Sequence, residues 1–342
     1  MASARVRLLF LNTFLLRVRL FAGLPGPDHA FTAPAVPERA LEIGQRLAGE
    51  YDVVALAEVF DRPEREAVLA GWKDRAASWV EGPGRTLWPP ALATSGLLTI
   101  TDGPPITRAE RHTFAARGHH LRETDAWANK GVLYAEIDVG LPDSRLEVVS
   151  THLIAGADLL TPHTRAHQAV AAERHRQVDE LLAFVDRVHR PGNATVVVGD
   201  FNVEGIDPEA HHARRLRDSM AAAGFSDLWL EHGAGLGPTC NLLRLGDRIG
   251  AEGPDGLCPD DAHPPADAER IDYAFLRPGN VVTGVIRLAR RSLPRESHAP
   301  GHGALAFLSD HLGLHLELEL DGGPGGLSAT RGGPRRSRRR TR

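Results

Sequence analysis

The stretch Thr195–Val203, TVVVGDFNV, decides the fold. Its first four residues are β-branched and Gly199 follows them, a pattern typical of a buried strand that ends in a tight turn. The turn delivers Asp200 and Asn202, two residues apart, to the end of the strand. A carboxylate and a carboxamide there can bind a divalent cation and a phosphoryl oxygen, although the same pattern also occurs in ordinary turns.

Polar side chains also accompany the other predicted strands, at Asn12, Glu58, His152, Asp272, and Asp310 with His311. Open α/β sheets bind ligands at the carboxyl ends of their strands, so we expect these groups to meet. Oxygen ligands together with two imidazoles suit Mg²⁺-assisted phosphoester hydrolysis. The zinc spacing of Cys and His, the nucleophile turn of serine hydrolases and the Gly-rich nucleotide loop are all missing from the sequence.

Hydrophobic periodicity predicts an α/β protein. The predicted helices cover 37–50, with Leu41, Ile43, Leu47 and Ala48 as the buried stripe, and 63–80, 163–189 and 208–223. The predicted strands cover 5–16, 52–60, 195–198, 270–275, 281–289 and 312–320, with 96–101 and 106–114 as one pair and 131–139 and 145–152 as an antiparallel pair.

Composition places few limits on function. The chain has 342 residues, of which 42% are hydrophobic and 25% charged, as is usual for a globular protein. We expect one domain over 1–321 and a disordered Gly/Pro/Arg-rich tail over 322–342, whose last twelve residues hold seven Arg. No signal peptide or membrane span is recognised, which predicts a cytoplasmic protein. Cys240 and Cys258 could pair if oxidised.

Taken together, the strand ends resemble the endonuclease/exonuclease/phosphatase superfamily, whose strands end in Asn, Glu, Thr-His, Gly-Asp-x-Asn, Asp-Tyr and Ser-Asp-His. The resemblance covers roughly residues 5–320 and implies a four-layer α/β sandwich, in which two mixed β-sheets lie face to face with helices outside. Three segments resemble the neutral sphingomyelinase branch: Glu58–Asp61, Asp125–Gly131 and Glu269–Tyr273. Abasic-site endonucleases usually carry Gln-Glu where this chain has Ala57-Glu58.

The resemblance implies a metal site and a base. Glu58 is expected to be the principal Mg²⁺ ligand, with Asn12 and Asp310 in support and Mn²⁺ or Co²⁺ as substitutes. His311 is expected to act as general base on the attacking water, with Asp272 fixing its tautomer. Members of the superfamily differ in the base, so Asp200 and His311 could exchange roles.

The resemblance also implies groups that contact substrate. His152 and Asn202 are expected to donate to the phosphoryl oxygens as charge builds in the transition state. Asp125 and Lys130, five residues apart, resemble the acid–lysine pair that switches on sphingomyelinase sites. Asn129 beside them is expected to bind phosphate.

The implied reaction is Mg²⁺-dependent hydrolysis of sphingomyelin to ceramide and phosphocholine. A nuclease of the same fold is the alternative, and a non-catalytic binding protein on this scaffold is the second. Membrane-attacking sphingomyelinases carry an aromatic hairpin before Ser-Asp-His, whereas Phe307 is the lone aromatic residue in that region here. We expect a monomer whose Arg-rich tail contacts anionic membranes peripherally.

Overall fold

The computed structural model describes residues 3–16, 19–20, 24–25, 33, 35–85, 93–116, 128–142, 144–155, 166–240, 256–258, 268–295 and 306–321. Two six-stranded sheets form its centre. The first sheet runs in the order β13 (Val282–Arg291), β14 (Gly313–Asp321), β1 (Ser3–Asn12), β4 (Val53–Ala57), β6 (Leu98–Asp102) and β5 (Ala77–Glu81). The second runs β11 (Ser226–Asp227), β12 (Asp272–Arg277), β10 (Ala194–Asp200), β9 (Leu146–His152), β8 (Gly131–Ile137) and β7 (Ile106–Thr113).

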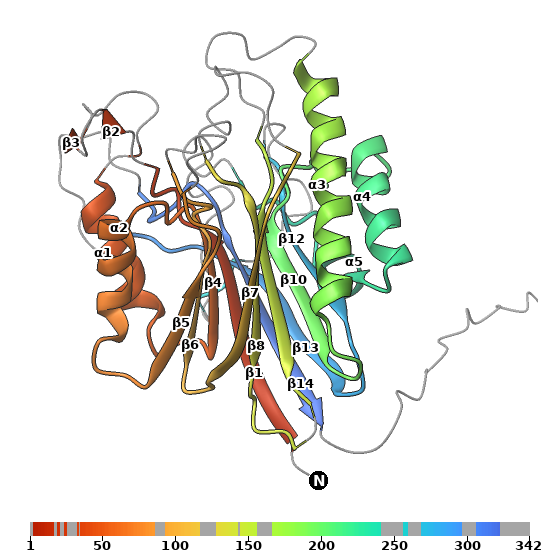
Figure 1. Cartoon of the computed structure of the whole chain (residues 1–342), viewed down its shortest axis with the longest axis horizontal. Helices are drawn as coiled ribbons and strands as arrows, with labels where there is room; N and C mark the ends of the chain where they lie inside the picture. Colours follow the sequence, from red (N-terminus) through yellow and green to blue (C-terminus); the bar gives the residue numbers. More distant parts are fainter. Residues whose placement is uncertain are drawn as a thin grey trace, which may run out of the picture.

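Helices cover the outer faces of both sheets. Helices α1 (Val36–Leu47) and α2 (Arg62–Leu69), with the 3₁₀ turn η1 (Ala70–Trp72), flank the first sheet, and α3 (Ala166–Val188) and α4 (His211–Ala222) flank the second (Figure 1). A short helix, α5 (Leu228–His232), and the two-stranded ribbon of β2 (Arg19–Leu20) and β3 (Leu24–Pro25) complete the described elements. None of the helices described is long and apolar enough to cross a membrane.

Both sheets are mixed. Strand β1 runs parallel to β4 and antiparallel to β14, while β10 runs parallel to β9 and antiparallel to β12. The predicted four-layer sandwich of two mixed sheets with helices outside is therefore confirmed. The antiparallel pairing of 131–139 with 145–152 is confirmed as well.

Strand alternation builds three apolar layers. In β1, Leu8 and Phe10 point into the core between the sheets, and Leu9 and Leu11 point outward to α1. The β-branched run of β10 divides in the same way, with Val196 and Val198 inward and Val197 toward α3 and α4. Because both faces of these strands are buried, their sequences are continuously apolar.

One predicted element and one predicted core residue in the N-terminal part of the chain are wrong. The predicted helix 63–80 ends at Leu69, and its last residues belong instead to β5. The predicted buried residue Leu41 is 40% exposed. The buried stripe of α1 consists of Val36, Arg39, Ala40, Ile43, Gly44 and Leu47, so Leu41 lies outside it. Gly44 packs closely against α2, since an added Cβ would lie 2.0 Å from the carbonyl oxygen of Val68.

The predicted pairing of 96–101 with 106–114 is also wrong. Strand β6 pairs with β4 and β5, whereas β7 pairs with β8 in the other sheet. The short link Gly103–Pro105 therefore passes from one sheet to the other. A short link between two consecutive strands looks like a hairpin in sequence, but here it joins two layers.

Candidate active site

Strand register places three site residues side by side in the second sheet. Asp200 ends β10, and its partners across the sheet are His152 at the end of β9 and Asp272 at the start of β12. Asp272 thus lies at an amino end, because β12 runs antiparallel to β10. His311 likewise precedes β14, which is antiparallel to β1. The expectation that all these groups follow carboxyl ends is therefore wrong for Asp272 and His311, although the edge is shared.

The first sheet contributes Asn12 and Glu58. Asn12 ends β1 beside Ala57 of β4, and Glu58 is the next residue. The side-chain amide nitrogen of Asn12 donates to Oε1 of Glu58 (3.2 Å) and to Oδ2 of Asp200 (3.0 Å). One amide therefore connects the carboxylates of the two sheets. Glu58 has a φ of 63°, in the left-handed region that non-glycine residues seldom adopt.

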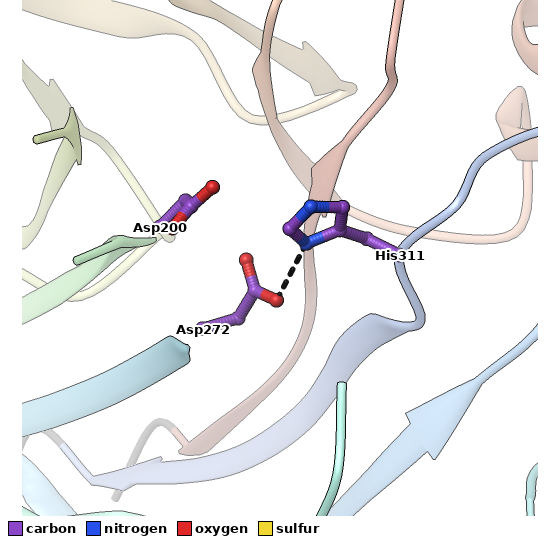
Figure 2. A group of neighbouring side chains, drawn as sticks. All are labelled: Asp200, Asp272 and His311. Carbon is purple, nitrogen blue, oxygen red and sulfur yellow. Dashed lines mark hydrogen bonds and ion pairs between the residues drawn. The ribbon is translucent and has the colours of Figure 1, made fainter. Parts of the chain in front are cut away.

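Asp272 and His311 form a buried dyad (Figure 2). The ring nitrogen Nδ1 of His311 donates to Oδ2 of Asp272 at 2.8 Å. Ligand atoms of Asp200, Asp272 and His311 all lie within 4.8 Å of one another. The other ring nitrogen, Nε2, lies 3.5 Å from Sγ of Cys240 and 3.9 Å from Oδ1 of Asp310.

Charge and burial tune two of these groups. Burial raises the pKa of Asp200 to about 7, and the neighbouring Asp272 carboxylate adds to the rise. Burial alone would lower the pKa of His311, but Cys240, Asp272 and Asp310 outweigh it and hold that pKa well above its usual value. Because burial also raises the pKa of Cys240 to about 11, its thiol is neutral near pH 7 and the two carboxylates are the effective charges.

Lys130 and His152 form the side of the site opposite the dyad. The ammonium group of Lys130 donates to Nε2 of His152 (2.8 Å) and to the carbonyl of Leu153 (3.4 Å). The same Nε2 atom lies 3.5 Å from Oδ2 of Asp200 and 4.0 Å from Oε1 of Glu58. Burial, and then the Lys130 charge, hold the pKa of His152 well below its usual value, so its ring is neutral.

Two predicted phosphate contacts are engaged with the protein itself. The amide nitrogen of Asn202 donates to the carbonyl of Leu153 (3.1 Å), and its main-chain N–H donates to Asp200 (2.9 Å). The amide of Asn129 donates to the Gly84 carbonyl at 2.5 Å. Of the two residues, Asn202 contacts the site directly, through Asp200. Asp125 lies outside the described residues.

The donor set fits a hard divalent cation. Burial raises the pKa of Glu58, and the nearby Asp310 raises it further. The Oε2 atom of Glu58 and the Oδ1 atom of Asp272 are buried and make no hydrogen bond within the part of the chain described. Four carboxylates, from Glu58, Asp200, Asp272 and Asp310, therefore gather where oxygen ligands remain available, which suits Mg²⁺.

Sequence reasoning missed the residues that support the dyad. The hydroxyl of Thr239 accepts the main-chain N–H groups of Ile271 and Asp272, both at 3.2 Å, and its carbonyl accepts the N–H of Leu312 (2.7 Å). Thr239 lies in a segment read as a loop, where no pattern marks such a role. Within the described residues, neither Cys240, beside it, nor Cys258 forms a disulfide.

Comparisons with known proteins agree with this architecture. A Caenorhabditis elegans protein described as a candidate neutral sphingomyelinase is 24% identical over 293 residues, and the alignment covers 83% of this chain and 61% of the relative. The chain thus spans less than two thirds of that relative's length.

Two crystal structures share the fold. A Staphylococcus aureus beta toxin variant with bound magnesium ions matches with a TM-score of 0.59 at 18% identity, covering 91% of this chain and 98% of the toxin. Sphingomyelinase C from Streptomyces griseocarneus matches with a TM-score of 0.57 at 22% identity, covering 92% and 99%. The sequence profile of the Endonuclease/Exonuclease/phosphatase family matches residues 32–311, most of the described sandwich. The chain belongs to the endonuclease/exonuclease/phosphatase family.

Proposed function

We propose that this protein is a Mg²⁺-dependent phosphodiesterase that hydrolyses sphingomyelin to ceramide and phosphocholine. One observation carries the proposal. A buried imidazole–carboxylate dyad, Asp272 with His311, lies across Asp200 from a second carboxylate, Glu58, that keeps a buried oxygen available. Hydrolysis of a phosphodiester needs a base to activate water and a cation to stabilise the phosphoryl group, and the dyad and Glu58 could supply these from two sides of the site.

Glu58 would hold the metal ion, with Asn12 and Asp310 beside it. A bound Mg²⁺ would polarise a phosphoryl oxygen and neutralise charge that develops on it. Asn12 orients Oε1 of Glu58 by its hydrogen bond, which leaves Oε2 for the ion. The protein thus contributes the Glu58 carboxylate, which Asn12 holds in place and which is mostly shielded from water.

His311 would accept the proton of the attacking water at Nε2, because Nδ1 is committed to Asp272. A thiol is a weak hydrogen-bond partner, so Cys240 competes poorly with water for that atom. As the bond from water oxygen to phosphorus forms, the bond to the ceramide oxygen breaks. Asp200, whose pKa is about 7, would give its proton to that leaving oxygen.

Lys130 would supply positive charge to the phosphoryl group. It is buried, and its charge is felt by both Glu58 and Asp200. His152 and Asn202 would then bind the phosphoryl oxygens through groups that become available when substrate enters. Asn129 would bind phosphate, and Asp125 would pair with Lys130 to switch the site on, as the resemblance of this segment to the sphingomyelinase branch implies.

The lipid substrate is proposed from the relatives. One is described as a candidate neutral sphingomyelinase and another is named sphingomyelinase C. The segment that ends in Asn129 and Lys130 resembles that branch. We further propose that 1–321 forms one catalytic unit that acts as a monomer, and that the Arg-rich residues 322–342 attract the protein to anionic lipid.

The test is phosphocholine release from sphingomyelin–phosphatidylserine vesicles, with Mg²⁺ or with EDTA, beside nicking of plasmid DNA. We expect Mg²⁺-dependent phosphocholine release that exceeds nicking. Efficient nicking without phosphocholine would establish the nuclease instead. Absence of both activities, with intact Mn²⁺ binding, would leave the binding protein as the better hypothesis.

A further inference from the structure

Arg39 is a fully buried arginine on the inner face of α1. Its neighbours on the buried stripe of that helix are small or apolar, as at Val36, Ala40 and Ile43. Burial lowers the pKa of Arg39 to about 10, so the guanidinium stays charged near neutral pH. A buried charge is costly unless its N–H groups find partners. An apolar residue would pack this helix at lower cost, so the arginine calls for an explanation.

The guanidinium of Arg39 joins two segments that are far apart in the sequence. Its Nη1 atom donates to the carbonyls of Thr13 (3.1 Å) and Leu308 (2.6 Å), and its Nη2 atom donates to the carbonyl of Phe14 (2.5 Å). The charged group also lies 5.6 Å from the centroid of the Phe14 ring. Because a guanidinium presents its N–H groups in a rigid planar fork, these bonds fix the spacing of the two segments.

The first segment carries the proposed metal ligands. Thr13 follows Asn12, and its hydroxyl donates to the carbonyl of Ala57 at 2.8 Å. The main-chain N–H of Thr13 donates to the same carbonyl at 3.0 Å. Ala57 directly precedes Glu58. The carbonyl that Arg39 holds is therefore one residue from Asn12 and is tied to the residue before Glu58.

The second segment carries the proposed base. Leu308 directly precedes Ser309, Asp310 and His311. The hydroxyl of Ser309 donates to the carbonyl of Asn12 (2.6 Å) and accepts the main-chain N–H of His311 (3.0 Å). Arg39 and Ser309 thus bridge the same two segments.

We propose that Arg39 is a positioning residue, which fixes the metal ligands Asn12 and Glu58 relative to Asp310 and His311 through the main chain. The assignment of those groups rests on the proposed function. Arg39 itself acts only through the segments that it holds. Outer partners of metal ligands commonly change metal affinity or activity by 10- to 100-fold, so the effect is measurable.

The experiment compares Arg39→Lys and Arg39→Gln with wild type and with Ile43→Val, which trims the same buried face of α1. Mn²⁺ affinity is measured by electron paramagnetic resonance of the free ion, and the ring resonances of His311 by NMR. We expect Arg39→Lys to weaken Mn²⁺ binding about tenfold and to shift the His311 resonances. Ile43→Val should lower the melting temperature and leave both readouts unchanged.

Addition of guanidinium ion to Arg39→Ala at non-denaturing concentration should restore part of the lost Mn²⁺ affinity, which a general loss of stability would not allow. Wild-type Mn²⁺ affinity and unchanged His311 resonances in Arg39→Lys would overturn the proposal, whatever its melting temperature. Failure of all three Arg39 variants to fold, with Ile43→Val folded, would also overturn it in favour of a folding role.

The proposed function can fail separately. A wild-type protein that binds Mn²⁺ but releases no phosphocholine would overturn only the lipid substrate. A wild-type protein that binds no Mn²⁺ would overturn the metal assignment, and the His311 resonances would then decide the role of Arg39. In that case unchanged resonances in Arg39→Lys would refute it.

Discussion

Replacing Asp272 with asparagine tests the dyad with almost no change in shape. The carboxylate accepts the Nδ1 proton of His311 at 2.8 Å. The main-chain N–H of Asp272 donates to Thr239, a contact that the variant keeps. An asparagine can turn its NH₂ group toward Nδ1, which then has to accept. The ring proton moves to Nε2, the atom that we propose as the base.

The magnitude follows from the lost charge and the wrong tautomer. At an effective dielectric constant of about 20, two unit charges about 4 Å apart attract by about 4 kcal/mol, which corresponds to roughly three pKa units. Removing the Asp272 charge should therefore lower the pKa of His311, while Asp310, 3.9 Å from Nε2, still raises it. With the tautomer effect added, we expect kcat to fall by about 10³- to 10⁴-fold, as in catalytic triads.

The sign of the pH effect is also fixed. A general base works in its neutral form and a general acid in its protonated form, so the rate rises with pH through the lower of the pKa values of His311 and Asp200. The Asp272 charge raises both pKa values. Removing it therefore moves the rising limb to lower pH. The assay is kcat against pH at saturating Mg²⁺, with Asp186→Asn, an exposed residue on α3, as the control.

Alanine variants complete this test. Groups that act as one unit are non-additive, so Asp272→Ala, His311→Ala and the double variant should lose similar amounts of activity. Additive losses, or a rising limb that stays in place in Asp272→Asn, would refute the dyad. Asp200 would then be the better candidate for the base.

Four further predictions concern the metal, the lysine, the scaffold and the tail. Glu58→Gln should abolish Mg²⁺-stimulated phosphocholine release without lowering the melting temperature by more than a few degrees, and undiminished turnover of wild type in EDTA would contradict it. Lys130→Met should cut phosphocholine release about 100-fold and raise the pKa of His152 in an NMR titration, because the Lys130 charge helps to lower it. Glu147→Gln should destabilise the fold by about 3 kcal/mol in thermal melts yet leave kcat within about twofold, since this fully buried carboxylate accepts four hydrogen bonds far from the dyad. Burial would raise the pKa of Glu147, but the hydrogen bonds outweigh it and lower that pKa. The stability that Glu147 contributes is therefore present above the unfolded pKa of about 4.3 and is lost as pH falls through the folded pKa. A difference in stability between wild type and Glu147→Gln that grows in acid would contradict this. Deleting 322–342 should weaken sedimentation with anionic vesicles at low salt and leave turnover of detergent-solubilised lipid unchanged.

Much of the fold could be predicted because the central strands are recognisable as apolar runs in the sequence. Buried on both faces, β10 and β4 are apolar runs up to Gly199 and Ala57, and the carboxylates of Asp200 and Glu58 come directly after them. Strand direction was harder to predict. Nothing local in the sequence around Asp272 says that β12 is antiparallel to β10, and only this pairing puts its first residue beside Asp200.

The supporting residues Arg39 and Thr239 could not be predicted, because their roles depend on contacts between segments that are far apart in the sequence. Arg39 looks like a surface arginine, although its spacing from Val36 and Ile43 places it on the buried stripe. The predicted stripe was right at Ile43 and Leu47 but wrong at Leu41, which is exposed. Thr239 contacts two strands from a segment without periodicity.

Backbone strain shows why these supports matter. Of the four non-glycine residues with positive φ in the described chain, three lie just beyond strands that end in the site: Phe14, Glu58 and Asn202. Each such conformation costs about 1 to 3 kcal/mol and persists only where its surroundings hold it. A strand that delivers a side chain into the space between two sheets has to turn away sharply at once, so the strain lies where the chemistry is placed. Hydrogen bonds hold each turn, from Arg39 to the Phe14 carbonyl, from the N–H of Val59 to the Gly96 carbonyl, and from the N–H of Asn202 to Asp200. The geometry of the site therefore depends on its outer contacts as much as on the carboxylates and imidazoles that would meet the substrate.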